Sequence, residues 1–119
     1  MHAQELAIEA AKAADIKKAF DIEIIEVGAL SDSFDYFVIA SVNNDRQAEA
    51  VIDEVENRLR DNFNVRPLAI EGRKVSNWEL IDFGYVMVHV FEPEAREYYR
   101  LESLWGDAPR VSFEATELE

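Results

Sequence analysis

WELIDFGYVMVHVFEPEAREYYRLESLW, residues 78–105, predicts a strand hairpin that runs into an amphipathic helix. Residues 85–91 are apolar on both alternating sets, which is typical of a strand covered on two faces. The segment 82–84, Asp-Phe-Gly, predicts the turn before that strand. Pro93 suits the first turn of a helix, and the helix face that follows carries Tyr98, Leu101 and Trp105. We therefore expect strand, proline and helix to form one rigid corner.

The sequence before residue 78 predicts two helices and three strands. Residues 4–20 form an alanine-rich helical pattern, and residues 22–27 and 36–42 predict strands. A second helix follows the possible capping residues Asn44 and Gln47, and its apolar face carries Ala48, Val51, Ile52, Val55 and Leu59. Residues 65–70 predict a strand at a sheet edge, because Pro67 cannot donate a backbone hydrogen bond. The fold class predicted is α/β, with a mixed five-stranded sheet flanked by helices.

The length of 119 residues fits a single domain with one core. We expect this domain to span residues 1–106, since Gly106 and Pro109 break the last helix. Residues 107–119 end in an acidic, aperiodic run and are predicted to be a mobile C-terminal tail.

The net charge of the chain favours some classes of binding partner over others. The chain has 12 basic and 25 acidic residues, a formal net charge of -13, so its field repels phosphate backbones and disfavours direct nucleic-acid binding. The same field attracts a basic protein, although acidity also serves simply to keep a small domain soluble. The chain has no cysteine, so it has no disulfide framework and is indifferent to redox compartment. No signal peptide or membrane-spanning run is recognisable, so a cytoplasmic protein without membrane contact is expected.

Catalytic and metal sites are weakly supported. Gly28, Ser31, Asp32 and Asp35 faintly resemble the glycine, serine and paired carboxylates of phosphoryl-transfer enzymes. However, no phosphate-binding glycine-rich loop is present, and turn or strand-start roles explain both aspartates. His89 is interpreted as a buried, hydrogen-bonded residue, since one other histidine cannot complete a metal site with it. No catalytic residue, metal or cofactor is therefore predicted.

A partner-binding surface is the stronger prediction. Trp78 opens a strand after a polar run and offers the large area with a polar N–H that interfaces favour, although it could equally cap the core. Alternation places it on one face with Leu80 and Asp82. Tyr98 and Tyr99 cannot both face the core, because helix neighbours point about 100° apart. The candidate set is Trp78, Leu80, Asp82, Glu94, Arg96, Tyr98 and Tyr99.

Several motifs in order resemble the Iojap family, also called ribosomal silencing factor RsfS. They comprise Trp78, Asp82, Gly84, Val88, His89 and Pro93, Glu94, Arg96, Glu97, Tyr98, Tyr99, Leu101, Glu102, Leu104, Trp105, with Asp35–Ile39, Arg46, Gln47, Glu71 and Gly72. The chain departs from the family pattern at Tyr85, usually acidic, and at Val42, usually glycine.

The resemblance implies a nucleotidyltransferase-like fold without catalytic activity. It further implies a factor that binds the large ribosomal subunit through ribosomal protein L-fourteen, blocks joining of the small subunit when nutrients are scarce, and forms a homodimer. The alternatives are a nucleotidyltransferase-like enzyme and an acidic adaptor for another basic protein.

Overall fold

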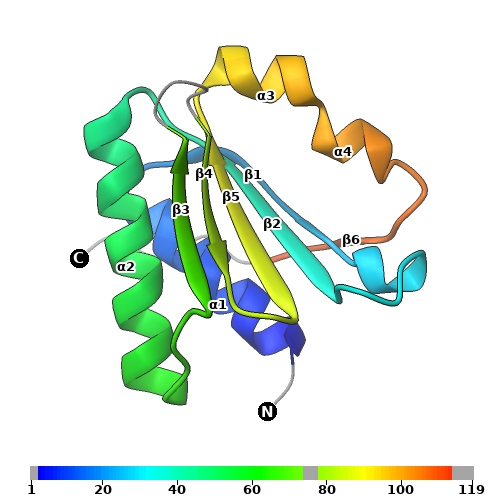
Figure 1. Ribbon diagram of the computed structural model, residues 1–119, viewed down its shortest axis with the longest axis horizontal. Coiled ribbons are helices and arrows are strands. Elements are labelled where there is room, and N and C mark those ends of the chain that lie inside the picture. The colour runs from blue at the N-terminus through cyan, green and yellow to red at the C-terminus, as the bar shows by residue number, and fades with distance from the viewer. Residues whose placement is uncertain (1–2, 74–77, 114–119) are drawn as a thin grey trace.

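The computed structural model describes residues 3–73 and 78–113. Within these ranges the chain forms one mixed sheet with helices on both faces (Figure 1). The helices are α1 (Ala3–Ile16), α2 (Asp45–Phe63), α3 (Pro93–Tyr99) and α4 (Leu101–Leu104), with a 3₁₀ turn at Val27–Ala29. The strands are β1 (Phe20–Ile25), β2 (Tyr36–Ser41), β3 (Ala69–Arg73), β4 (Trp78–Asp82), β5 (Val86–Phe91) and β6 (Arg110–Val111).

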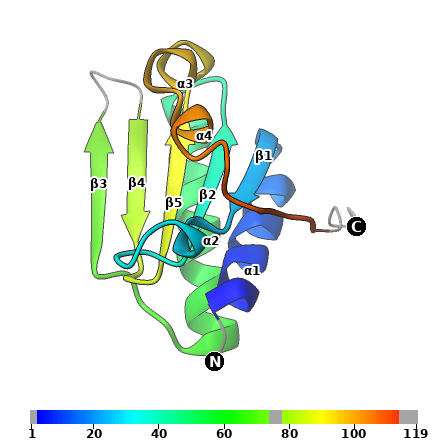
Figure 2. The same cartoon turned by 90° about the vertical axis from the view of Figure 1, so that its right-hand side faces the viewer.

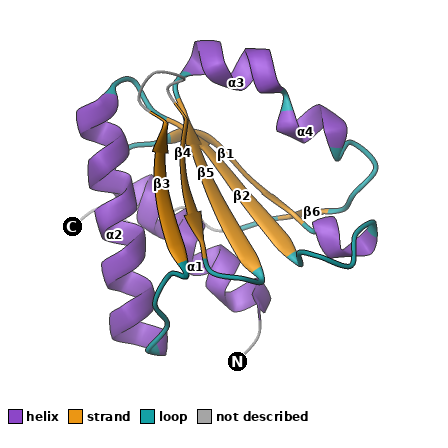
Figure 3. Cartoon of the chain, viewed as in Figure 1, coloured by secondary structure: helices purple, strands orange, loops and turns teal. Residues whose placement is uncertain are grey.

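The strand order is β3-β4-β5-β2-β1-β6; Figure 2 shows β3, β4, β5, β2 and β1 side by side across the view, and Figure 3 colours the chain by element type. Only β2 and β5 run parallel among these pairs; the others are antiparallel. The predicted α/β class and mixed sheet are thus confirmed. The strand predicted over residues 65–70 does lie at an edge of the sheet, but it spans Ala69–Arg73, so Pro67 lies outside it.

The sheet has a separate apolar layer on each face. The alanine-rich side of α1 and the apolar side of α2 pack on one face, with Ala10, Val51 and Leu59 fully buried. Small alanines let α1 approach the sheet closely. The other face is covered by α3, α4 and the segment after them, which pack on Phe37, Ile39 and Phe91. None of the helices in the described ranges combines the length and apolar character that a membrane crossing needs.

Two predictions about the C-terminal third differ from the structure. The helix expected to run from Pro93 to Trp105 is broken at Arg100, which has a left-handed φ of 49° and ends α3 before α4 starts. The sheet has six strands rather than five, because Arg110 and Val111 pair with Ile25 and Ile24.

The segment predicted as a tail, residues 107–119, is packed against the domain in its first part. Ala108 is buried in the same apolar layer as Phe91, and the Pro109 carbonyl accepts from the Glu26 N–H at 2.9 Å. Residues 107–113 are therefore part of the domain, while residues 114–119 of the predicted tail lie outside the described residues.

Candidate functional site

Trp78 is held in place from several directions at the start of β4. Its ring centroid lies 4.6 Å from Tyr99, 5.1 Å from Phe91 and 5.8 Å from His89. Its indole N–H donates to His89 Nδ1 at 3.2 Å. The side chain is nevertheless only half-buried, so it both covers the core and presents a fixed aromatic surface outward. The core-covering role considered for Trp78 is therefore present in the structure, and part of its ring remains at the surface, where contact with a partner stays a prediction.

His89 holds the Trp78 ring in place by accepting its indole N–H. It is only 4% exposed, and burial lowers the pKa of its imidazole to about 4. The ring is thus neutral near pH 7, which leaves Nδ1 free to accept the indole N–H. Its Nε2 has no hydrogen-bond partner among the described residues. The predicted structural role of His89 is confirmed, with the orientation of Trp78 as its particular task.

Leu80 and Asp82 share the face of β4 that carries Trp78. Both are half-buried, whereas Glu79 and Ile81, which alternate with Trp78, Leu80 and Asp82, are buried on the other face of the strand. Asp82 also organises the hairpin, because its Oδ1 accepts from the Gly84 N–H at 2.8 Å. A regular strand therefore brings two apolar side chains and a carboxylate onto one face, as predicted from alternation.

The two adjacent tyrosines of α3 point in different directions, as helix geometry predicts. Tyr98 is 81% exposed, while Tyr99 is half-buried against Trp78. Their rings meet edge to face, with centroids 5.1 Å apart. Glu94 is exposed four residues before Tyr98, on the same side of the helix. The structure thus joins α3 to the Trp78 face of β4 through Tyr99.

Arg96 differs from the expectation that it contacts a partner. It is 8% exposed, and its guanidinium donates to Glu102 at 2.8 Å and to Ser41 Oγ at 2.7 Å, with Glu23 at 3.4 Å. The pKa of Glu102, which burial alone would raise, is held below its ordinary value by the Arg96 hydrogen bond and the nearby positive charges. Arg96 therefore ties α3 to α4, β1 and β2. We call Trp78, Leu80, Asp82, Glu94, Tyr98 and Tyr99, without Arg96, the tryptophan surface.

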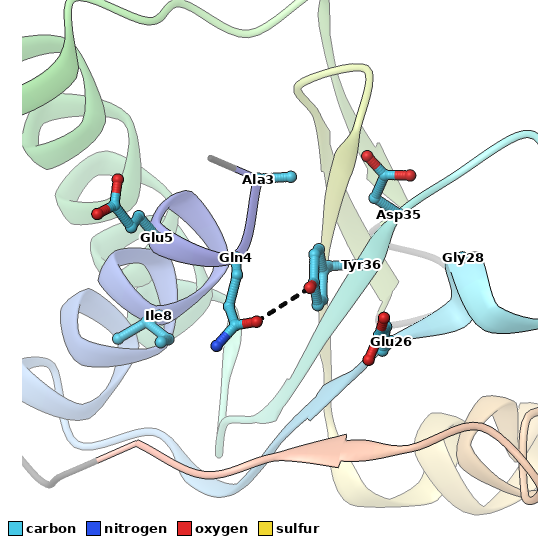
Figure 4. Close-up of a pocket in the computed structure, with 8 residues that line it drawn as sticks. All are labelled: Ala3, Gln4, Glu5, Ile8, Glu26, Gly28, Asp35 and Tyr36. Carbon is cyan, nitrogen blue, oxygen red and sulfur yellow. Dashed lines mark hydrogen bonds between the residues drawn. The ribbon is translucent and has the colours of Figure 1, made fainter. Parts of the chain in front are cut away.

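The candidate catalytic residues do not converge. Asp35 and Gly28 line a cavity of about 570 Å³ together with Glu5 and Glu26, but Asp32 and Ser31 are not among its lining residues. Figure 4 shows the residues that line it. Burial and the charges of Glu26 and Asp35 raise the pKa of the Tyr36 hydroxyl, which donates to Gln4 at 3.1 Å. All the charged residues that line this cavity are acidic, so its chemistry opposes a nucleoside triphosphate.

No cluster of three metal-ligating side chains occurs within residues 3–73 and 78–113. Sequence analysis did not recognise four aliphatic residues as exposed: Leu30, Leu68, Ile70 and Leu104. Periodicity gives little indication of them, since an apolar side chain in a predicted strand or helix is normally assigned to the core.

Comparisons with known proteins identify the family to which the chain belongs. The model of the family described as "Ribosomal silencing factor during starvation", RsfS, matches residues 1–119. The Bacillus subtilis protein named ribosomal silencing factor RsfS is 41% identical over 100 residues, 84% of each chain. The chloroplastic protein Iojap of Zea mays is 33% identical over 105 residues, 88% of this chain and 45% of that protein.

Solved structures extend the likeness to the fold. A crystal structure of a Chromobacterium violaceum protein superposes with a TM-score of 0.83 at 32% identity, covering 98% of this chain and 95% of the other. One from Bacillus halodurans gives a TM-score of 0.76 at 35% identity, over 92% and 98% of the two chains. With a family model matched along its whole length and relatives of this similarity, the chain belongs to the RsfS family of ribosomal silencing factors.

Proposed function

We propose that this protein represses translation by binding the large ribosomal subunit and sterically blocking its association with the small subunit. The names of its relatives support a ribosomal target. The partner proposed, from the family resemblance, is ribosomal protein L-fourteen. Nutrient limitation or stationary phase is the condition proposed for its action, in keeping with the description of the family.

The tryptophan surface is the observation that carries this proposal. A half-exposed indole fixed by His89 and Tyr99 loses little conformational freedom on binding, which is the property of an interface hot spot. Asp82 and Glu94 flank the aromatic residues with negative charge. Together with the net charge of -13, they suit a basic ribosomal protein better than ribosomal RNA.

The proposed mechanism requires no chemical step. Bulk placed at the subunit-joining face is sufficient, so the protein acts as a binding factor and not as an enzyme. A cytoplasmic location follows from the ribosomal target. Self-association into a homodimer is a further element of the proposal, based on the family resemblance.

Cosedimentation with purified large and small ribosomal subunits, followed by a subunit-joining assay, tests the proposal. We expect the protein to migrate with the large subunit alone and to reduce the amount of joined ribosomes. Trp78→Ala should weaken binding to the large subunit by about 2 kcal/mol or more, the range of an interface hot spot.

Leu30→Ala provides a matched control. Leu30 is an exposed apolar residue, 56% accessible, that follows the 3₁₀ turn before β2. Because Tyr36 at the start of β2 pairs with Val86, whereas Trp78 pairs with Phe91, Leu30 lies at the opposite end of the sheet. Equal binding by a folded Trp78→Ala variant and by the Leu30→Ala control would contradict the role given to Trp78.

A further inference from the structure

The outer edge of the sheet at β3 is exposed over residues 69–72. In the strand order β3 has β4 on one side only, and Figure 2 shows it at the outer limit of the sheet with no helix beyond it. Residues 68–72 are all exposed. Two of them are large and apolar: Leu68 is 74% accessible and Ile70 44%. This is an edge strand with apolar side chains in solvent.

The hydrogen-bond pattern identifies which backbone groups β4 uses. The Phe83 N–H donates to the Val86 carbonyl at 2.9 Å, so Phe83 faces β5. Residues of an antiparallel strand face their two neighbours alternately, and Leu80 and Asp82 therefore turn their backbone groups toward β3. The Leu68 N–H agrees with this assignment, because it donates to the Asp82 carbonyl at 2.7 Å.

The same alternation determines which groups of β3 face outward. Glu71 pairs with Leu80, so the backbone groups of Glu71 are bonded to β4. Ile70 and Gly72, on either side of it, direct their N–H and C=O groups away from the sheet. Two outward-facing donor and acceptor sets two residues apart are the template that an added strand recognises.

Natural proteins usually blunt such an edge with prolines, lysines or a covering element. The strand reads Ala-Ile-Glu-Gly-Arg over residues 69–73, which contains no proline and no lysine. Its one acidic and one basic residue balance, so the edge is open to a partner, and a preference for a basic one comes from the net charge of the whole chain.

We propose that β3 receives an extended, basic segment of the ribosomal partner protein as an added strand. This inference rests on the proposed function and deepens it. The net charge of -13 favours a basic chain at this edge. Backbone hydrogen bonds to Ile70 and Gly72 supply affinity, and the exposed Ile70 side chain packs on apolar residues of the incoming strand.

Gly72→Pro tests this proposal with Gly72→Ala as its matched control. Proline removes the outward N–H of residue 72 and leaves the β3–β4 hydrogen bonds intact, as proline at an edge strand can. A Cβ at Gly72 would meet no atom within 4 Å, so the alanine of the control has room. The proline ring takes the place of the outward N–H and so lies on the side away from β4. The experiment measures the affinity of each for purified large ribosomal subunits, with circular dichroism and thermal unfolding to verify folding.

The expected result is that Gly72→Ala binds like the wild type and Gly72→Pro binds at least tenfold more weakly. Equal binding by the two folded variants would overturn the added strand while leaving the proposed function intact. A wild-type dimer dissociated by Gly72→Pro without loss of subunit binding would also overturn it, because the edge would then hold a second copy. Failure of the wild type itself to bind large subunits would overturn the proposed function and this inference with it.

If Gly72→Pro does not fold, two substitutions of Ile70 that differ in the sign of their charge test the same proposal. Ile70→Lys and Ile70→Glu remove the same apolar side chain at an exposed position and differ only in charge. A basic incoming strand should be repelled by the lysine, so we expect Ile70→Lys to bind large subunits at least tenfold more weakly than Ile70→Glu at low salt. Equal affinities of the two variants would contradict a basic strand at this edge.

Discussion

His89 should make the stability of the fold depend on pH. Its pKa falls from 6.5 to about 4 because burial penalises the imidazolium. Below pH 6.5 the unfolded chain therefore binds more protons at this site than the folded chain does. The stability present above pH 6.5 is lost as the pH falls toward 4.

The size of this loss follows from the pKa difference. A fall from 6.5 to about 4 corresponds to about 3 kcal/mol of unfolding free energy. The site is buried, at 4% exposure, so solvent does little to weaken the penalty. Protonation at Nδ1 would in addition remove the acceptor of the Trp78 N–H. Stability and the orientation of the tryptophan surface should therefore decline together in acid.

Urea unfolding at several pH values between 7.5 and 4, followed by tryptophan fluorescence, measures this effect. The reference variant is His89→Asn, whose side-chain oxygen can accept the indole N–H but does not titrate in this range. The difference in unfolding free energy between wild type and variant should shift by about 3 kcal/mol across the range. Titration of the carboxylates is common to both proteins and cancels. A difference that stays constant with pH would refute the buried, neutral imidazole.

Two further changes should lower stability without touching the tryptophan surface. Arg96→Met should destabilise the protein by about 3 kcal/mol, because Glu102 and Ser41 lose their shared partner; a urea titration would show this, and a loss below about 1 kcal/mol would mean that the ion pairs are not important. Asn44→Ala should cost about 1 kcal/mol in the same assay, since the Asn44 side chain accepts the Gln47 N–H at the start of α2; Asn44→Ser, which retains a capping oxygen, should recover most of that loss.

Local patterns in the sequence were sufficient for much of the fold. The period of α2 and its capping residues identify that helix, because both depend on neighbours within four residues. The alternation along β4 likewise places Trp78, Leu80 and Asp82 on one face. The division between Tyr98 and Tyr99 follows from helix geometry alone.

Arg96 could not be assigned from such patterns. The sequence around Arg96 is that of an ordinary charged residue on a helix surface. Two of its hydrogen-bond partners, Ser41 and Glu23, lie 55 and 73 residues away along the chain. The pairing of β6 with β1 could not be predicted from a local pattern either. A two-residue strand has no period to read, and it exists because Arg110 and Val111 meet an open edge of β1.

The sequence by itself therefore determined the α/β class, the principal helices and strands, and the face on which Trp78 lies. Only the tertiary structure decided which side chains remain at the surface. It buried Arg96 in an ion-pair network, set His89 beneath Trp78, and left Ile70 and Gly72 at an uncovered edge. The reason is physical: backbone geometry and periodicity are local properties, whereas burial and hydrogen-bond partners depend on segments that meet only when the sheet is assembled.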